Sequence, residues 1–408
     1  MKRLALFGGT PIRADFLPYH KSWLEEDDLS SLLNAFRSGS IVGNGMYCKK
    51  AEKMLRDYLG VRFVLLTNSC TSALEIAMMI ASLKDQQEVL LPSFTFSSSA
   101  NTIVRNGGKP VFLEISPDTH NIDYSKIDEA ITPKTVGIVP VHYAGLPCEM
   151  DYIMKIAKER KLFVIEDAAQ ALGSKYKGQY IGNHGDIACF SFHATKNLTC
   201  GEGGAFVTND EHIAKEAEII REKGTNREAF LKGEIDKYTW VRTGSSFVLS
   251  DLLAAILITQ LKKIDIINRK RKENAEFLND RLYRLKDYIG LPDVTSNGST
   301  NWHLYAVSVP SEKREFYIKA LKAEGIGAAA HFVPLHLSTY GKDVLGYKEG
   351  MFPITEHFAS SLIRLPIYPQ LTEEDLEDIG HGVEKVVENA DDFENWSEKE
   401  ALKAKSVS

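Results

Sequence analysis

The feature that most constrains the fold is the alternation of short apolar runs with helical patterns between about residues 60 and 210. The run "VRFVLLTN" precedes "TSALEIAMMIASLK", whose apolar residues follow helical spacing. Further runs, each followed by turn or helix signals, are "EVLLPSF", "KPVFLEIS", "TVGIVPVHYAG", "LFVIEDAAQ", "DIACFSF" and "GAFVTND". Continuous apolar strands separated by helices predict an α/β fold with a mostly parallel sheet covered on both faces.

The rest of the chain predicts a second, smaller unit. Residues 250–285 read as one long helix or two nearly continuous ones, apolar at first and then heavily charged. Strand and helix patterns follow between 300 and 390. We therefore expect a large α/β domain over residues 1–250, a smaller α+β domain over 251–390 and a charged tail over 391–408.

Composition excludes several classes of protein. The formal charge is −6, from 49 basic and 55 acidic residues, and no long basic run occurs, so neither a nucleic-acid nor an anionic-membrane partner is expected. The sequence contains no run of about 18 apolar residues, so no membrane span is expected. The apolar stretch at the start of the chain is too short for a signal peptide. Five cysteines without a C-x-x-C pair favour a reducing compartment, the cytoplasm, and argue against a disulfide frame or a metal site.

Lys196, in "SFHATKNLTCGEGG", is the first candidate for chemistry. It follows a strand end, where a parallel α/β sheet binds its ligands. A lysine amine attacks carbonyl carbons when its ammonium form is disfavoured by burial or nearby cations. The alternative is an ordinary exposed lysine in a loop.

Asp167, in "LFVIEDAAQ", is a second candidate whose chemistry complements that of Lys196. A carboxylate after an apolar strand is costly to bury unless something such as a pyridinium N–H pairs with it, although Asp167 would also serve as a helix cap. A strand-end aspartate and a later strand-end lysine, about thirty residues apart, are the usual pair for pyridoxal phosphate. The aspartate keeps the ring nitrogen protonated and the lysine forms the Schiff base.

Two further segments suit the same cofactor. In "TNSCTSALE", hydroxyl residues begin a helix directly after a strand, where free N–H groups attract a phosphate; simple helix capping is the alternative. In "PSFTFSSSAN", an aromatic side chain at a strand exit would lie against a cofactor ring, unless it is plain core.

Together these segments resemble the sugar-nucleotide aminotransferases of the DegT/DnrJ/EryC1/StrS family, which have the aspartate-aminotransferase fold (fold type I). The resemblance runs from "LALFGGTPIR" through "LLTNSCTSALE", "LPSFTFSSSAN", "PVHYAGLPCEMD", "VIEDAAQALGS" and "SFHATKN…GEGG" to "HFVPLH" and "LPIYP". It implies a homodimer with the active site between the subunits. It also implies that Lys196 is the catalytic lysine, that Asp167 pairs with the ring nitrogen and Gln170 lies near the ring hydroxyl. Phosphate binding falls to Thr71, Ser72 and Ser191, and ring stacking to Phe96.

Within the family, "EIIREKGTNREAF" followed by "DKYTWVRTGSSF" is most similar to the dTDP-4-amino-4,6-dideoxygalactose transaminases. These aminate dTDP-4-keto-6-deoxyglucose with L-glutamate, in deoxyaminosugar biosynthesis for lipopolysaccharide or antigens. The substrate-binding candidates implied are Lys223, Thr225, Asn226, Arg227, Tyr238, His331 and His336. A charged surface loop, and structural histidines, are the alternatives.

One motif departs from the family. Many relatives have Gly-Tyr-Asn-Tyr-Arg where this chain has "GSSFV", and their asparagine reaches the cofactor phosphate of the other subunit. Ser246 takes its place and would offer a hydroxyl instead. Other open alternatives are a different nucleotide-linked ketosugar (a C3 ketone, or GDP- or UDP-linked) and a sugar dehydratase, whose known forms replace the lysine by histidine. His193 and Cys200 receive no role and are treated as packing residues.

Overall fold

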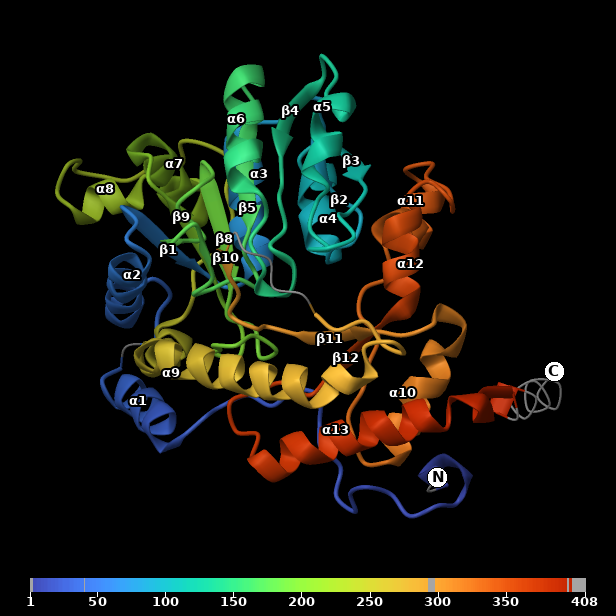
Figure 1. Ribbon diagram of the computed structural model, residues 1–408. Coiled ribbons are helices and arrows are strands. Elements are labelled where there is room, and N and C mark those ends of the chain that lie inside the picture. The colour runs from blue at the N-terminus through green and yellow to red at the C-terminus, as the bar shows by residue number, and fades with distance from the viewer. Residues whose placement is uncertain (1–2, 40, 293–297, 395, 398–408) are drawn as a thin grey trace, which may run out of the picture.

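The computed structural model describes residues 3–39, 41–292, 298–394 and 396–397. Its centre is a seven-stranded sheet of order β1-β9-β8-β5-β4-β2-β3 (Figure 1). The strands are β1 (Phe63–Thr67), β2 (Glu88–Pro92), β3 (Lys109–Leu113), β4 (Thr135–Ile138), β5 (Phe163–Asp167), β8 (Ile187–Ser191) and β9 (Gly204–Thr208). Only β9 runs antiparallel to its neighbours in this sheet, which confirms the mostly parallel architecture.

Helices cover both faces of the sheet. One face packs against α3 (Cys70–Ala81), α4 (Ser97–Arg105) and α7 (Glu211–Arg221). The other packs against α2 (Met46–Leu59), α6 (Met150–Arg160) and the first half of α9 (Asp251–Leu282). Successive strand residues alternate between the two cores, as Val164 and Ile165 do in β5. Burial on both faces explains why the strands read as unbroken apolar runs.

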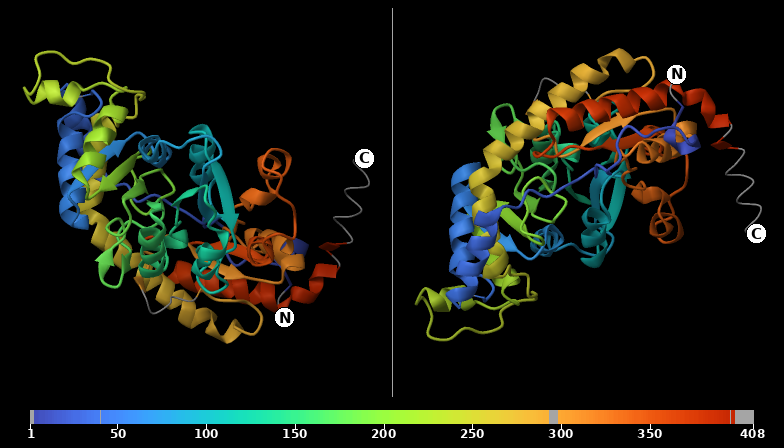
Figure 2. Two further views of the ribbon diagram at one scale, coloured as in Figure 1. Left: turned by 90° about the horizontal axis from the view of Figure 1, so that it is seen from above. Right: turned by 90° about the horizontal axis from the view of Figure 1, so that it is seen from below.

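Helix α9 joins the two cores as one unbroken helix of 32 residues. Ser250 caps it by accepting a hydrogen bond from the Leu253 N–H at 3.5 Å. Its first half contributes apolar side chains to the large core, and Ala275, Leu278 and Leu282 belong to the second core. Figure 2 shows α9 running from the blue helices near the sheet to the red C-terminal helix.

The second core lies around a two-stranded antiparallel sheet. It comprises β11 (Tyr305–Ser308), β12 (Leu362–Leu365), α10 (Arg314–Ala323) and α13 (Glu373–Glu388). The N-terminal segment packs here as well, since Leu4 and Leu17 are buried in this core. The expected division at residue 250 therefore differs from the packing, because burial of Leu4 and Leu17 assigns the chain's start to the smaller core.

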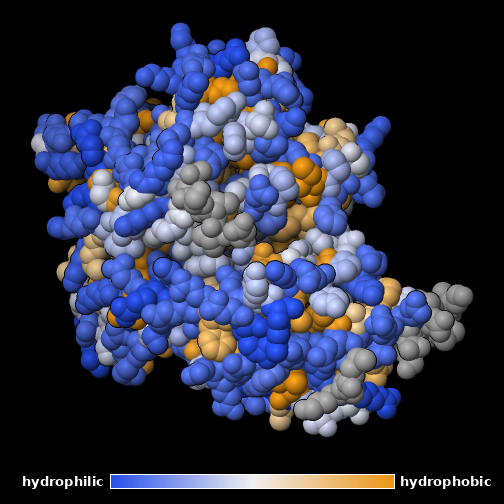
Figure 3. All heavy atoms as spheres, viewed as in Figure 1, coloured by the Kyte–Doolittle hydropathy of each residue, from blue (hydrophilic) through white to orange (hydrophobic). Residues whose placement is uncertain are grey.

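The remaining elements are short or peripheral. They are α1 (Glu26–Arg37), α5 (Ile127–Ala130), α8 (Arg227–Leu231), α11 (Thr339–Asp343), α12 (Pro353–Ser361), β6 (Lys175–Tyr176), β7 (Gln179–Tyr180) and β10 (Gly298–Ser299). All five cysteines are buried and free. Among the described residues no helix is both long and apolar enough to cross a bilayer, and the face in Figure 3 is largely hydrophilic. Most of the predicted tail lies outside the described residues.

Candidate active site

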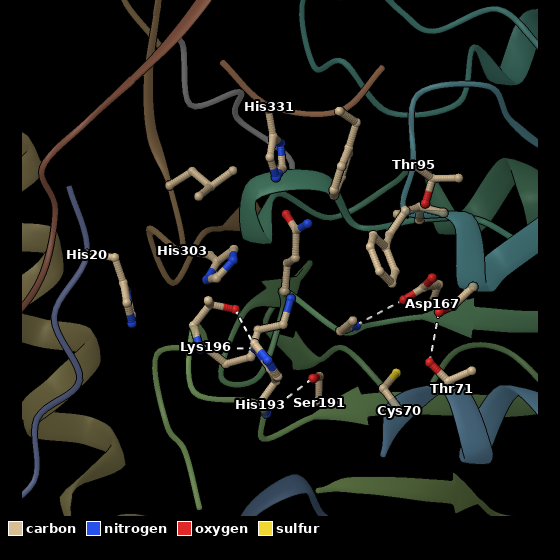
Figure 4. A pocket seen from close by; sticks show the side chains of 18 of the residues that line it. His20, Cys70, Thr71, Thr95, Asp167, Ser191, His193, Lys196, His303 and His331 are labelled. Carbon is tan, nitrogen blue, oxygen red and sulfur yellow. Dashed lines mark hydrogen bonds between the residues drawn. The ribbon is translucent and has the colours of Figure 1, made fainter. Parts of the chain in front are cut away.

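A cavity of about 290 Å³ lies where the carboxyl ends of β5 and β8 meet the smaller core. Figure 4 shows Asp167, Ser191 and Lys196 on one side of it and His331 on the other. Seven predicted site residues line the cavity, namely Thr71, Phe96, Asp167, Gln170, Ser191, Lys196 and His331. The topology brings them together because the carboxyl ends of parallel strands share one edge of the sheet.

Lys196 lies in a tight turn after β8. The turn is closed by its own backbone N–H, which donates to the His193 carbonyl at 2.9 Å. The next residue, Asn197, anchors the turn by donating to the Asn301 carbonyl and by a 2.9 Å hydrogen bond to His303 Nδ1. Burial lowers the pKa of Lys196, and the positive charge of Arg364 acts in the same direction. A neutral, nucleophilic amine is thus more accessible here than on an exposed lysine.

Asp167 ends β5 and is 5% exposed. Its Oδ2 accepts a 2.6 Å hydrogen bond from Ser99 Oγ, and its Oδ1 accepts one from the Ala169 N–H at 3.2 Å. Within the described part of the chain, no basic side chain lies within ion-pair distance of this carboxylate. An ionised carboxylate accepts about four hydrogen bonds, so Asp167 retains acceptor positions for a cationic N–H donor in the cavity.

The start of α3 also lines the cavity, through Ser69, Cys70 and Thr71. Ser69 caps the helix by accepting from the Ser72 N–H at 3.1 Å, whereas the N–H of Thr71 has no protein acceptor among the described residues. Thr71 Oγ1 shares a 2.8 Å hydrogen bond with Ser98 Oγ. Free N–H groups at a helix N-terminus, with hydroxyls beside them, are suited to an anion such as phosphate.

Gly204 and Ser72 also contribute to the structure around the start of α3. A Cβ on Gly204 would lie 2.4 Å from the Cys70 nitrogen, so only glycine permits this close backbone approach at the end of the "GEGG" run. Ser72 does not line the cavity; its Oγ donates to Asn68 Oδ1 at 2.5 Å. The phosphate-binding assignment of Ser72 therefore remains a prediction, and its hydroxyl is engaged by Asn68 and Ser69.

Two further predicted residues, Phe96 and Gln170, line the same cavity. Phe96 is 57% exposed although it lines the cavity, so its ring face is open to a planar group. Gln170 Oε1 accepts from the Ala144 N–H at 2.7 Å. This bond fixes the amide and leaves its NH₂ group as a donor.

The two predicted histidines have different positions. His331 lines the cavity, and its Nδ1 shares a 2.8 Å hydrogen bond with the Tyr143 hydroxyl. Burial lowers its pKa to about 2, so the ring is neutral. His336 is fully buried outside the cavity lining, between Ser93 Oγ at 2.6 Å and Glu356 Oε1 at 2.9 Å. Both ring nitrogens of His336 are thus engaged within the protein, and its assignment to substrate binding remains a prediction.

The segment from 223 to 246 lies elsewhere on the chain. It follows α7, beside the edge strand β1, and α8 projects there from the side of the molecule away from α10 (Figure 1). None of its predicted residues lines the cavity of the chain itself: Lys223, Thr225, Asn226, Arg227, Tyr238 and Ser246. A single chain thus does not bring these side chains to Lys196.

Several cavity residues were not predicted from sequence. Among them, Tyr19 and His20 come from the N-terminal segment and Arg364 from β12. His193, treated above as packing, also lines the cavity and bonds Thr195 Oγ1 at 2.9 Å. The only signal in the sequence for Arg364 is a charged residue within the apolar run "LIRLPIYP".

Comparison with known proteins agrees with this geometry. The DegT/DnrJ/EryC1/StrS aminotransferase family matches residues 23–384. The Bacillus subtilis spore coat polysaccharide biosynthesis protein SpsC is 35% identical over 387 residues, which are 93% of this chain and 99% of SpsC.

Solved structures have the same fold over nearly the whole chain. Helicobacter pylori PseC, an aminotransferase involved in the biosynthesis of pseudaminic acid, superposes with a TM-score of 0.85 at 27% identity, over 92% of this chain and 100% of PseC. The PLP-form of Spr1654 from Streptococcus pneumoniae gives 0.85 at 28% identity, over 92% and 99% of the two chains.

Proposed function

The chain belongs to the DegT/DnrJ/EryC1/StrS aminotransferase family, and on this basis we propose that it transfers the amino group of L-glutamate to the C4 ketone of dTDP-4-keto-6-deoxy-D-glucose. The product would be dTDP-4-amino-4,6-dideoxy-D-galactose. The general activity of the family is that of a sugar aminotransferase with pyridoxal phosphate as cofactor. The donor, the nucleotide and the position of the ketone are the proposed part.

The observation that carries the amino-transfer chemistry is that Lys196 and Asp167 line the same cavity. Asp167 is a nearly buried carboxylate with no cationic partner among the described residues, which fits a pyridinium N–H. Thr71 and Ser191 fit the phosphate end, and Phe96 offers its ring face. When bound, pyridoxal phosphate supplies an electron sink that acidifies the carbon bearing the amino group.

Lys196 then acts as the proton carrier. Its Nζ, free once the donor has bound, takes the proton from the donor's α-carbon in the first half of the reaction. In the second half it delivers a proton to C4 of the sugar, and the face from which it does so sets whether the new amine is axial or equatorial. The lowered pKa of Lys196 suits this role, because the neutral amine must be accessible near neutral pH.

The sugar-nucleotide assignment is supported by the segment from 223 to 246, which resembles that of the C4 transaminases acting on dTDP-sugars. We propose that the protein is a homodimer in which this segment reaches the partner's cavity, since it does not reach its own. The residues assigned to this contact are Lys223, Thr225, Asn226, Arg227, Tyr238 and Ser246. His331, from the smaller core, would contact the sugar within its own subunit.

The test uses the purified protein loaded with pyridoxal phosphate. We expect glutamate to change its absorbance spectrum, and later addition of dTDP-4-keto-6-deoxyglucose to restore it with an axial C4 amine in the product, identified by NMR. Lys196→Ala should lose turnover by at least about 1,000-fold, because its proton transfer has no substitute. Turnover retained in Lys196→Ala refutes the mechanism, whereas a 3-amino or equatorial product, or reaction only with a GDP- or UDP-sugar, refutes the substrate assignment.

A further inference from the structure

His303 lines the cavity just before β11 and is 6% exposed. Its backbone is held on both sides of the Cα atom: the N–H donates to Asn301 Oδ1 at 3.1 Å, and the carbonyl accepts from Arg271 Nη2 at 3.0 Å. Arg271 is itself buried, at 1% exposed. The ring of His303 is therefore presented to the cavity from a rigid support, and Figure 4 shows it close to Lys196 and His20.

The hydrogen bond between His303 and Asn197 determines which ring nitrogen carries the hydrogen. Asn197 Nδ2 donates to the Asn301 carbonyl at 2.9 Å and to Asn268 Oδ1 at 3.4 Å. Both amide hydrogens are thus used. The atom that faces His303 Nδ1 at 2.9 Å is the amide oxygen, which only accepts. His303 Nδ1 therefore carries a hydrogen and donates it to Asn197.

The other ring nitrogen, Nε2, keeps a free lone pair. Burial lowers the pKa of His303 well below its usual value, and the positive charges of Lys196 and Arg271 act in the same direction. The ring is therefore neutral, with its single hydrogen on Nδ1. In the part of the chain that the structure describes, no group donates to Nε2. The cavity wall thus offers an uncharged hydrogen-bond acceptor close to the amine that moves the protons.

The two substrates of a sugar aminotransferase differ in what they present to such an acceptor. An α-amino acid carries an ionised carboxylate next to its reacting carbon, and the oxygens of a carboxylate only accept. A ketosugar carries a hydroxyl on a carbon next to its ketone, and the hydrogen of an enclosed hydroxyl needs an acceptor. In 4-keto-6-deoxyglucose this is the hydroxyl at C3, because C5 carries the methyl group instead.

We propose that His303 is a specificity-determining residue for the sugar, and that its Nε2 accepts a hydrogen bond from the hydroxyl next to the ketone. The inference rests on the proposed amino transfer to a ketosugar, but not on the nucleotide that the sugar carries. A ketosugar without this hydroxyl leaves Nε2 unpaired in the cavity and is disfavoured. The lone pair of His303 thus acts in the second half of the reaction, and the first half does not use it.

The test uses a substitution that removes Nε2 and keeps the donor. In His303→Asn, the side-chain NH₂ takes the position of Nδ1–H and still donates to Asn197, whereas nothing replaces Nε2. In the enzyme loaded with pyridoxal phosphate, stopped-flow absorbance follows the step with glutamate and the step with the ketosugar separately. We expect His303→Asn to slow the step with dTDP-4-keto-6-deoxyglucose at least about 10-fold and to leave the step with glutamate within about 3-fold of wild type.

A second sugar shows whether the hydroxyl is the group that His303 contacts. This analogue has hydrogen in place of the hydroxyl at C3. Wild type should prefer the hydroxylated sugar by at least about 10-fold in kcat/KM, and His303→Asn should reduce the preference to less than about 3-fold. His381→Asn, which changes an exposed histidine in α13, should behave as the wild type does with both sugars.

The inference is overturned by any of three results. One is equal slowing of both steps in His303→Asn, which would mean a structural role alone; the others are an unchanged preference for the hydroxyl in this variant and no preference in wild type. If wild type aminates only a GDP- or UDP-linked ketosugar, the proposed substrate fails, and the same comparison on that sugar decides the role of His303. If wild type aminates no ketosugar, both proposals fail.

Discussion

At the scale of single residues, the cavity depends on side chains that hold others in place. Ser99 Oγ donates to Asp167 Oδ2 at 2.6 Å, and both residues are buried. Ser99→Ala leaves the carboxylate with the Ala169 N–H alone and frees it to turn away from a bound pyridinium. Because a hydrogen bond to a charged group contributes about 1.5–3 kcal/mol, we expect the Kd for pyridoxal phosphate to rise at least about 10-fold, measured by absorbance titration.

Ser97→Ala is the matched control, since Ser97 is exposed in the first turn of the same helix. It should bind the cofactor as the wild type does. Equal affinity in Ser99→Ala and Ser97→Ala would show that Asp167 keeps its position without the Ser99 hydroxyl.

At the scale of elements, a buried ion pair ties α2 to α7 across β1. Arg221 Nη1 donates to Glu52 Oε1 at 2.7 Å and to the Leu66 carbonyl at 3.0 Å, and Arg221 is 1% exposed. Glu52→Ala would leave this guanidinium buried without its counter-ion. We expect the free energy of unfolding to fall by about 3–5 kcal/mol, seen as a lower urea midpoint by circular dichroism.

The comparison variant is Asp57→Ala in the same helix, which removes an exposed ion pair with Lys53. Its urea midpoint should stay near that of the wild type because exposed pairs contribute little. Coincident midpoints for Glu52→Ala and Asp57→Ala would rule out a structural role for the buried pair. The segment assigned to the sugar nucleotide begins directly after Arg221, so this pair also fixes its starting point.

At the scale of the whole molecule, the N-terminal segment links the smaller core to the cavity. Glu324 is fully buried and accepts from the Ala5 and Ile12 N–H groups at 2.7 and 3.1 Å, while Lys385 Nζ lies 2.7 Å from its Oε2. Beyond this anchor the segment leads to Tyr19, which packs on Arg364.

Glu324→Gln should loosen this anchor, because an amide neither neutralises Lys385 nor accepts hydrogen bonds at both of its terminal atoms. We expect trypsin to cleave after Arg13 at least about 10-fold faster, followed by mass spectrometry. Glu312→Gln, which changes an exposed glutamate in the C-terminal part of the chain, should be cleaved at the same rate as the wild type. A cleavage rate for Glu324→Gln equal to that of the wild type would mean that packing of Leu4 and Leu17 alone holds the segment.

Much of the fold and part of the site were predictable from local pattern. Apolar runs predicted each strand of the central sheet, and α9 was expected as a long helix. Lys196 and Asp167 were found because they follow strand ends, and strand ends of a parallel sheet converge on one edge. Because β5 and β8 are neighbours in the sheet, their carboxyl ends bring the two residues into one cavity.

What the sequence by itself determined about this protein is therefore the set of elements and the residues attached to strand ends. Tertiary structure alone decided the rest. Tyr19, His303 and Arg364 meet at the cavity from three separate segments of the chain, whereas His336 lies in a buried hydrogen-bond network outside the cavity lining. Side-chain periodicity reports which face of an element is buried, but not which distant segment covers that face; that pairing depends on long-range packing of the two cores.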